Sequence, residues 1–153
     1  MQLSPAHYDE RLTAPRSWWG ITALTGLACA LMLLPLGTLP LLAGLIGGTA
    51  LTGLLVSSYG SQRVRVVGGT LAAGEARIPV AALGDPEVLD AEEARAWRTY
   101  KADMRAFMLM RSYVPTAVRV EVTDPSDPTP YVYVSTREPQ ALAAAIRAAQ
   151  GRD

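Results

Sequence analysis

The feature that most constrains this chain is a long stretch without charge, because no Asp, Glu, Lys or Arg lies between Arg16 and Arg63. About 18 uncharged, apolar residues already indicate a membrane helix. The stretch is too long for one span, and the segment 35–40 (PLGTLP) interrupts it near its middle. The sequence therefore predicts a transmembrane hairpin with helices of about 18–34 and 39–59. A signal peptide would carry only one such segment.

Composition narrows the function. The 14 basic and 14 acidic residues cancel, so no nucleic-acid partner is expected, because binding to a polyanion needs a surplus of basic side chains. One Cys and one His leave neither a disulfide framework nor a site built from several Cys or His ligands. No dinucleotide, P-loop or nucleophile-elbow motif is present. We expect no metal, no cofactor and no enzymatic activity.

Basic residues set the expected orientation. Arg11 and Arg16 precede the hairpin and Arg63, Arg65 and Arg77 follow it, whereas its central connection has none. Because cytoplasmic flanks carry the excess of Lys and Arg, both termini are predicted in the cytoplasm of a plasma (inner) membrane protein. The residues expected at the bilayer interface are Arg16, Trp18, Trp19, Tyr59, Arg63 and Arg65.

Small residues recur every four positions along both predicted helices: Thr22, Gly26 and Ala30 on the first, and Gly44, Gly48 and Thr52 on the second. Such spacing lets helix backbones approach closely in lipid. In an antiparallel hairpin, Ala30 would face Gly44, Gly26 would face Gly48, and Thr22 would face Thr52. Closure of the hairpin within one chain is the favoured interpretation. A homo-oligomer or a partner helix is the alternative.

The remaining residues predict a folded domain over 61–153, after a short cytoplasmic segment at 1–16 and the hairpin at 17–60. Alternating or β-branched apolar residues indicate strands, and Asp90 can cap a helix. The expected strands are 63–66, 75–80, 107–110, 118–122 and 131–136, and the expected helices are 91–101 and 139–150. This order predicts an α+β membrane protein whose mainly antiparallel domain has an inserted helix and a C-terminal helix.

Two resemblances extend this interpretation. The hairpin followed by VRVVGGTLAAGEARIPVAALG resembles the opening of bacterial PH-like membrane proteins, which implies a PH-like roll or barrel. The segments YDERLTAPRSWW and LMRSYVPTAVRVEVTDPSDPTPYVYVSTREPQALAAAI resemble an actinobacterial family of two-span membrane proteins of unknown function. That match covers nearly the whole chain, although relatives tend to carry Trp where this chain has Val132. The resemblance implies no activity, substrate or cofactor.

Candidate site residues cluster late in the chain. Asp124 and Asp127 flank a turn, where capping of the turn is favoured over a cation site that would need about six oxygens. Ser135, Thr136 and Arg137 precede a helix, and helix N-termini attract anions. The alternative there is simple capping with an ion pair at Arg137. Tyr131 shares a strand face with Tyr133, which predicts either a core or a recognition surface.

Three functions remain open at this point. The first is a membrane-anchored interaction or scaffold module that binds a protein partner through the region from Asp124 to Arg137. The second is a domain that senses an anion or a lipid headgroup through Arg137 and the arginines next to the bilayer. The third, ranked last because acid-base and nucleophilic groups are few, is an enzyme acting on a membrane-phase substrate.

Overall fold

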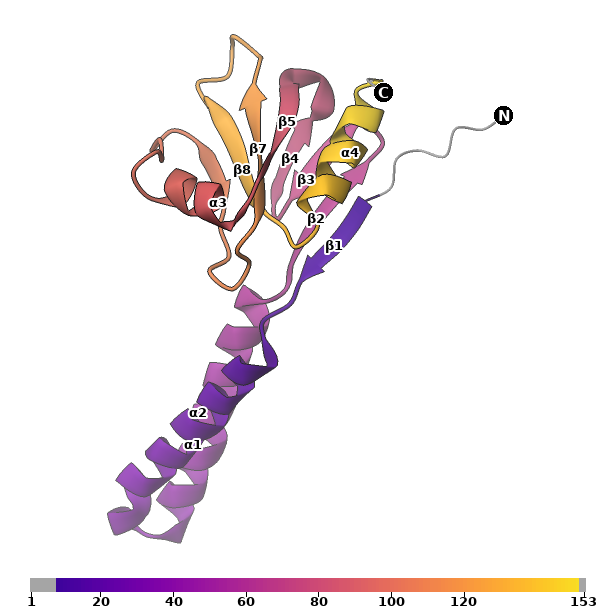
Figure 1. Ribbon diagram of the computed structural model, residues 1–153. Coiled ribbons are helices and arrows are strands. Elements are labelled where there is room, and N and C mark those ends of the chain that lie inside the picture. Colours follow the sequence, from indigo (N-terminus) through magenta and orange to yellow (C-terminus); the bar gives the residue numbers. More distant parts are fainter. Residues whose placement is uncertain (1–7, 152–153) are drawn as a thin grey trace. The chain divides into compact units, whose positions relative to one another are not determined.

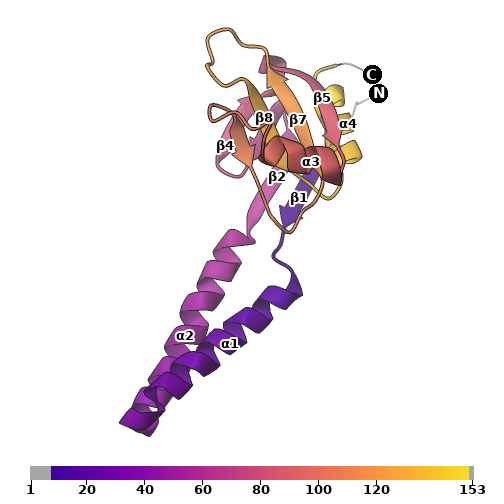
Figure 2. The ribbon, with the colours of Figure 1, turned by 60° about the vertical axis from the view of Figure 1, so that its left-hand side comes forward.

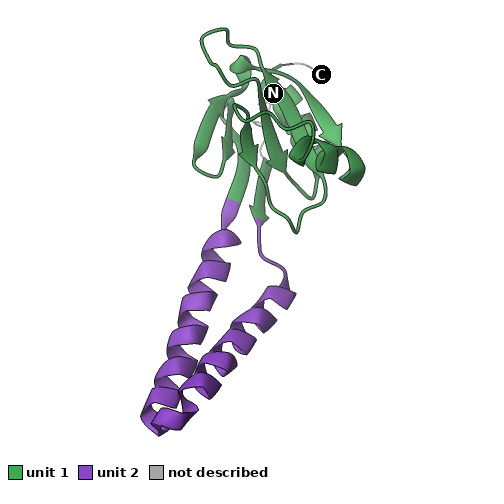
Figure 3. Ribbon diagram, turned by 90° about the vertical axis from the view of Figure 1, so that its left-hand side faces the viewer, with its two compact units in different colours: residues 1–11, 63–153 green, residues 12–62 purple. Residues whose placement is uncertain are grey.

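The structure is a computed structural model that describes residues 8–151, and the chain divides into two compact units (Figure 3). The helical unit holds residues 12–62. The other unit, here called the sheet unit, holds residues 8–11 together with 63–151. The helical unit is thus an insertion near the start of the sheet unit.

The helical unit is a hairpin of two long helices (Figure 1). Helix α1 spans Arg16–Leu33, a 3-10 helix η1 spans Leu34–Leu36, and α2 spans Thr38–Tyr59. Gly37 makes the turn with a φ of 112°, which L side chains rarely adopt. The predicted bounds agree with the structure to within two residues. At 1.5 Å per residue the helices reach about 27 Å and 33 Å, and both are long and apolar enough to cross a membrane.

Small side chains form the contact between α1 and α2. A Cβ built on Gly48 would lie 3.4 Å from the Cα of Gly26, and one built on Gly44 would lie 2.8 Å from the carbonyl oxygen of Cys29. The backbones therefore approach this closely only because these positions lack side chains. The buried residues of α1 are the three small ones spaced one turn apart: Thr22, Gly26 and Ala30.

The facing pairs differ from expectation away from the centre of the hairpin. Gly26 meets Gly48 as expected, but Gly44 meets Cys29, and a Cβ on Gly53 would lie 3.7 Å from the Cγ2 of Thr22. The facing residues thus shift by one position on either side of the central contact. The two helices diverge toward the open end of the hairpin (Figure 3).

The first sheet of the sheet unit has the order β1-β2-β3-β4. Its strands are Tyr8–Leu12 (β1), Gln62–Val67 (β2), Thr70–Ala73 (β3) and Ala76–Pro79 (β4). Gly68 and Gly69 join β2 to β3 with φ values of 56° and 74°, the left-handed conformation that a two-residue hairpin turn requires. Strand β1 comes from the segment expected to be separate, so the hairpin joins two neighbouring strands of one sheet.

The second sheet has the order β5-β7-β8-β6. Its strands are Leu83–Leu89 (β5), Phe107–Leu109 (β6), Ala117–Val122 (β7) and Tyr131–Ser135 (β8). The central pairs are antiparallel, whereas β6 runs parallel to β8. Strands β6, β7 and β8 confirm the prediction, while β5, which contains a glycine and a proline, was not predicted.

Three helices accompany the sheets. The 3-10 helix η2 spans Val80–Ala82, α3 spans Ala91–Arg98 and α4 spans Pro139–Ala149. The side chain of Asp90 accepts a hydrogen bond from the Glu93 N–H at 2.9 Å and caps α3. That helix ends three residues earlier than predicted. Helix α4 packs against β5 and β7 and buries its apolar stripe, which includes the side chains of Leu142 and Ile146.

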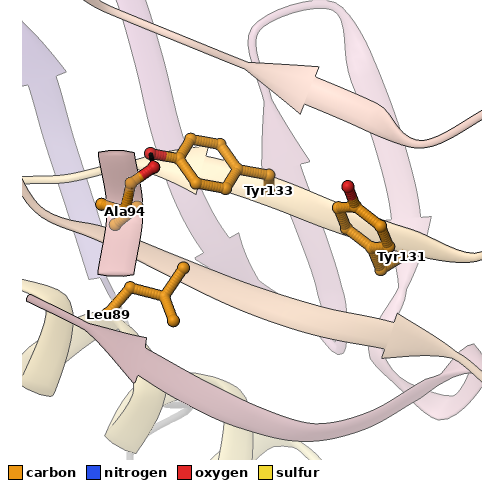
Figure 4. Packing of buried hydrophobic residues seen from close by; sticks show 5 residues of the cluster. Leu89, Ala94, Tyr131 and Tyr133 are labelled. Carbon is orange, nitrogen blue, oxygen red and sulfur yellow. Dashed lines mark hydrogen bonds between the residues drawn. The ribbon is translucent and has the colours of Figure 1, made fainter. Parts of the chain in front are cut away.

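The second sheet carries a core on each face. Toward α3 lies a cluster of five buried residues: Leu89, Ala94, Ala117, Tyr131 and Tyr133 (Figures 2 and 4). The Tyr133 hydroxyl donates to the Ala94 carbonyl at 3.3 Å, which satisfies a polar group inside an apolar setting. Because strand residues alternate between faces, Val118, Val120, Val132 and Val134 face the other way and are also buried.

The chain is α+β with two N-terminal helices, as predicted, and its strands form two sheets. The sheet unit departs from the expected PH-like succession of antiparallel strands in two respects. Strand β6 pairs in parallel with β8, and the first sheet takes its outer strand β1 from before the hairpin.

Candidate functional site

The Asp124 to Pro130 loop is a capped, exposed turn. The Asp124 carboxylate accepts from the Ser126 N–H at 2.9 Å and from its hydroxyl at 2.6 Å. These bonds stabilise the charged form and lower the pKa of Asp124. Asp127 accepts from the Thr129 N–H at 2.8 Å. Both carboxylates thus stabilise the turn itself, and no group of three Asp, Glu, His or Cys within residues 8–151 could hold a metal ion.

Tyr131 belongs to the core rather than to a surface. It is 4% exposed, and its hydroxyl accepts from the Asp103 N–H at 3.0 Å. Its ring meets Trp97 edge-on, with 5.2 Å between centroids. The Arg119 guanidinium lies 4.2 Å from the Trp97 ring centroid and 4.9 Å from that of Tyr131. It also forms ion pairs with Glu87 and Glu121 at 3.1 and 3.0 Å. Arg119 was not among the site residues predicted from the sequence.

Ser135 and Thr136 are buried at the end of β8, and their hydroxyls bind within the protein. Ser135 accepts from the Arg111 N–H at 3.1 Å. The Thr136 hydroxyl is 2.5 Å from a Glu10 carboxylate oxygen and accepts from the Glu138 N–H at 3.1 Å. The other Glu10 oxygen accepts from the Arg137 N–H at 3.0 Å. A carboxylate from β1 therefore lies where an anion was expected, just before α4.

Tyr8 completes this arrangement, here called the Glu10 latch (Tyr8, Glu10, Thr136 and the Arg137 N–H). The Tyr8 hydroxyl donates to Glu10 at 2.7 Å and is 3.0 Å from the Thr136 hydroxyl. Burial, followed by the adjacent Glu10 charge, raises the pKa of Tyr8 well above its usual range. The latch fixes β1 to the segment before α4 and fills the expected anion position from within the chain.

Arg137 contributes its backbone N–H to the latch, while its guanidinium lies 5.9 Å from the centroid of the Tyr113 ring. Arg137 is therefore partnered on both its backbone and its side chain. Together with the capped Asp124 turn and the buried Tyr131, this placement gives the predicted residues of the Asp124 to Arg137 region partners within the chain.

A different group of side chains gathers on the outer face of the first sheet. Arg63 and Arg65 are two positions apart on β2, so both point to this face. The Arg63 guanidinium pairs with Asp9 at 2.7 Å, and the Arg65 Nε is 3.6 Å from the same carboxylate. Beside them the sheet is hollowed, with a volume of about 290 Å³. The hollow is lined by five residues: Arg65, Val67, Thr70, Ala72 and Arg77.

The expected interface residues of the hairpin lie at its open end. The rings of Trp18 and Tyr59 stack, with 5.6 Å between centroids and 12° between planes, so the two helices present aromatic rings at one level, as expected. Trp19 is half exposed and Arg16 begins α1 as an exposed residue. On α2, Gly44, Gly48 and Thr52 are each partly buried.

Four residues that matter here were not predicted from the sequence: Tyr8, Asp9, Glu10 and Thr70. One signal could have found the first three. In YDERL the residues Tyr8 and Leu12 lie an even number of positions apart, so in a strand they point to the same face, and both are buried. His7, the one histidine of the sequence, lies outside the described residues.

Comparison with known proteins gives one family. The family model described as "Protein of unknown function (DUF3093)" matches residues 7–146. No curated protein and no solved structure matches the chain.

Proposed function

The chain belongs to the DUF3093 family, and we propose that it is a membrane-anchored interaction module that presents its sheet unit on the cytoplasmic side of a plasma membrane. In this proposal the hairpin anchors the protein in the membrane, and the sheet unit binds the partner. The resemblance to actinobacterial two-span proteins supports this assignment of the host membrane.

The exposed faces of α1 and α2 carry the proposal. Large apolar side chains point outward along both helices, including Leu24 at 67% exposed, Leu39 at 81% and Ile46 at 68%. A core helix of a water-soluble protein would bury such side chains, because each gains about 1.5–3 kcal/mol on leaving water. Lipid tails are the surroundings in which this outer surface is stable, since the interior contact is left to small residues.

Orientation rests on the basic residues at the two ends. Arg16 begins α1, and Arg63 follows α2 after three uncharged residues, while the turn at residues 34–38 has no charge. The positive-inside rule therefore favours a cytoplasmic sheet unit and a short external turn. Because only residues 13–15 and 60–61 connect the strands to the helices, the tether is short on both sides.

A binding role, and not a chemical one, suits the side chains of the sheet unit. Its buried polar groups serve the Glu10 latch and the core, and its charged residues lie mostly at the surface. The proline-rich loop presents the carboxylates of Asp124 and Asp127 on a turn that the side chains themselves rigidify. This loop is the surface that we assign to a protein partner. We also propose that the sheet unit is a PH-like barrel, which its two sheets and its C-terminal helix support.

Crosslinking and affinity capture from native membranes test the partner. We expect one stoichiometric protein with the wild-type chain. Asp127→Asn should lose it, because Asn keeps the turn-capping oxygen but removes the charge. Glu75→Gln makes the same change at another exposed turn and should retain the partner. Equal capture by both variants would contradict the assignment of this loop.

A second candidate function, binding of an anion or a lipid headgroup, is favoured by one observation. The hollow on the first sheet brings Arg65 and Arg77 to the same surface. The anion site that this observation supports lies at Arg65 and Arg77, whereas the sequence predicted one at Arg137.

A further inference from the structure

The hollow on the first sheet has a pattern of side chains that strand pairing dictates. Ala72 is the Cα partner of Arg65 on β2 and of Arg77 on β4. Paired residues point to the same face of a sheet, so two arginines flank one alanine. Thr70 and Val67 pair with each other in the next row of that face. A small residue between two long cations leaves the depression that these five residues line.

The charge balance of this face favours a bound anion. Asp9 is its one acidic neighbour on β1, and its carboxylate lies nearest to Arg63, with the Arg65 Nε farther away at 3.6 Å. The Arg65 side chain keeps 43% of its surface exposed. Arg77 is exposed and makes no ion pair with residues 8–151, and the nearby Glu75 is exposed in the turn before β4. Two guanidinium groups, those of Arg65 and Arg77, thus border the hollow, and the Asp9 carboxylate is shared between Arg63 and Arg65.

We propose that this hollow binds a phosphate ester, with Arg65 and Arg77 holding the phosphate oxygens and the Thr70 hydroxyl adding a hydrogen bond. Arginine forks match the geometry of phosphate oxygens and bind them through paired hydrogen bonds. Val67 and Ala72 offer apolar contact to the carbon atoms next to the phosphate. A volume of about 290 Å³ is at the lower end for ligand pockets, about 300–1,000 Å³, which suits a headgroup and not a whole lipid.

Two sources could supply such a phosphate, a lipid headgroup or a soluble phosphate compound. The lipid source deepens the proposed function and rests on it, because β2 begins only two residues after α2. Phosphate binding itself does not require that the hairpin spans a bilayer. The two claims therefore fail separately: extraction of membranes tests the anchor, and titration of the detergent-solubilised chain tests the hollow.

The experiment is calorimetric titration of the full chain in neutral detergent micelles with three probes: inorganic phosphate, dihexanoyl phosphatidic acid and dihexanoyl phosphatidylcholine. We expect phosphatidic acid to bind. Arg77→Gln should weaken that binding about ten-fold or more, because one charge-assisted contact is lost. Arg95→Gln removes the same charge from an exposed position on α3 and should change the affinity less than about two-fold.

Thr70→Val provides a second variant of nearly unchanged shape, and we expect it to weaken binding about three-fold or more. Preference for phosphatidic acid over inorganic phosphate would assign the site to lipid, and equal affinity would assign it to soluble phosphate. Equal losses in Arg77→Gln and Arg95→Gln would overturn the proposal, because they would show attraction to overall charge only. Absence of binding by phosphate and phosphatidic acid to a correctly folded chain would overturn it as well.

Discussion

The helical unit and the sheet unit solve the packing problem in opposite ways. In the hairpin the contact between helices is made by Thr22, Gly26 and Ala30, and the leucines face outward. In the sheet unit large side chains such as Leu71 and Tyr133 are completely buried, and the charged residues lie mostly at the surface. Large apolar side chains therefore face outward in the helical unit and inward in the sheet unit of the same chain.

If the hairpin is a membrane anchor, as we propose, this inversion follows from the solvent that surrounds each unit. In water, burial of large apolar side chains drives packing. In lipid that drive is absent between helices, so close contact of small residues and internal hydrogen bonds take over. The hydroxyls of Thr25 and Thr52 donate to carbonyl oxygens one turn earlier in their own helices, so these two groups need no water as a partner. The same substitution should consequently have opposite effects in the two units.

Charge on an exposed position gives the largest expected contrast. Leu24→Arg with Ile46→Arg places charges near the centres of both helices, at about 3 kcal/mol each for insertion into a bilayer. We expect the double variant to be lost from membranes washed at alkaline pH. Tyr100→Arg with Met104→Arg adds the same charge at highly exposed positions of the sheet unit and should remain with the membrane. Retention of the hairpin variant at wild-type levels would remove the distinction between the units.

Removal of the Glu10 latch should have the next largest effect, on the sheet unit alone. Glu10→Ala deprives the Arg137 N–H and the hydroxyls of Tyr8 and Thr136 of a charged acceptor. We expect the free energy of unfolding to fall by about 3 kcal/mol, measured by urea unfolding of the full chain in micelles. Glu75→Ala, at an exposed turn, should change it by less than about 0.5 kcal/mol. A loss of similar size in both variants would contradict the latch.

Added volume distinguishes the two faces of α2. Gly44→Leu should push the helices apart at a cost of about 1–3 kcal/mol, because its Cβ would meet the Cys29 carbonyl at 2.8 Å. Gly47→Leu should be tolerated, since no atom lies within 4 Å of a Cβ there. The readout is the rate at which Cys29 reacts with N-ethylmaleimide in micelles, which should rise only for Gly44→Leu. Identical rates in the two variants would mean that the helices do not pack through this face.

The smallest expected effect is a change in stability with pH. The folded state raises the pKa of Tyr8 above the unfolded value of about 10. Stability from the neutral hydroxyl is therefore complete below pH 10 and declines as the pH rises from there toward the folded pKa. Urea unfolding of the full chain between pH 9 and 11 should show the onset of this decline. Tyr8→Phe should be less stable at neutral pH yet flatter above pH 10, and an unchanged slope would exclude Tyr8 as the cause.

The elements that sequence predicted are those with a local signal. Absence of charge located both helices of the hairpin, and alternation of valines located β7. Strand β3 was not predicted because Ala72 and Ala73 have little β propensity. Strand β5 was not predicted because Pro86 interrupts its pattern of apolar residues. Strand β1 was missed because its partner β2 lies beyond the whole hairpin, and pairing over such a distance leaves no trace in spacing.

The candidate site could be predicted only in its local parts. Capping of the turn by Asp124 depends on a residue two positions away and was the favoured interpretation of this residue. The contact between Thr136 and Glu10 joins residues 126 positions apart, and only the folded sheet brings them together. The hollow likewise depends on the register that places Ala72 between Arg65 and Arg77, which no single strand reveals.

Accessibility of single cysteines tests the central claim, that the hairpin crosses a bilayer with the sheet unit inside. In a Cys29→Ala background, one variant carries Leu36→Cys beside the turn between the helices and another carries Ser126→Cys in the exposed loop. A membrane-impermeant maleimide added to intact cells should label position 36 and leave position 126 unlabelled until the cells are permeabilised. Labelling of position 126 in intact cells, or of neither position until permeabilisation, would contradict the account.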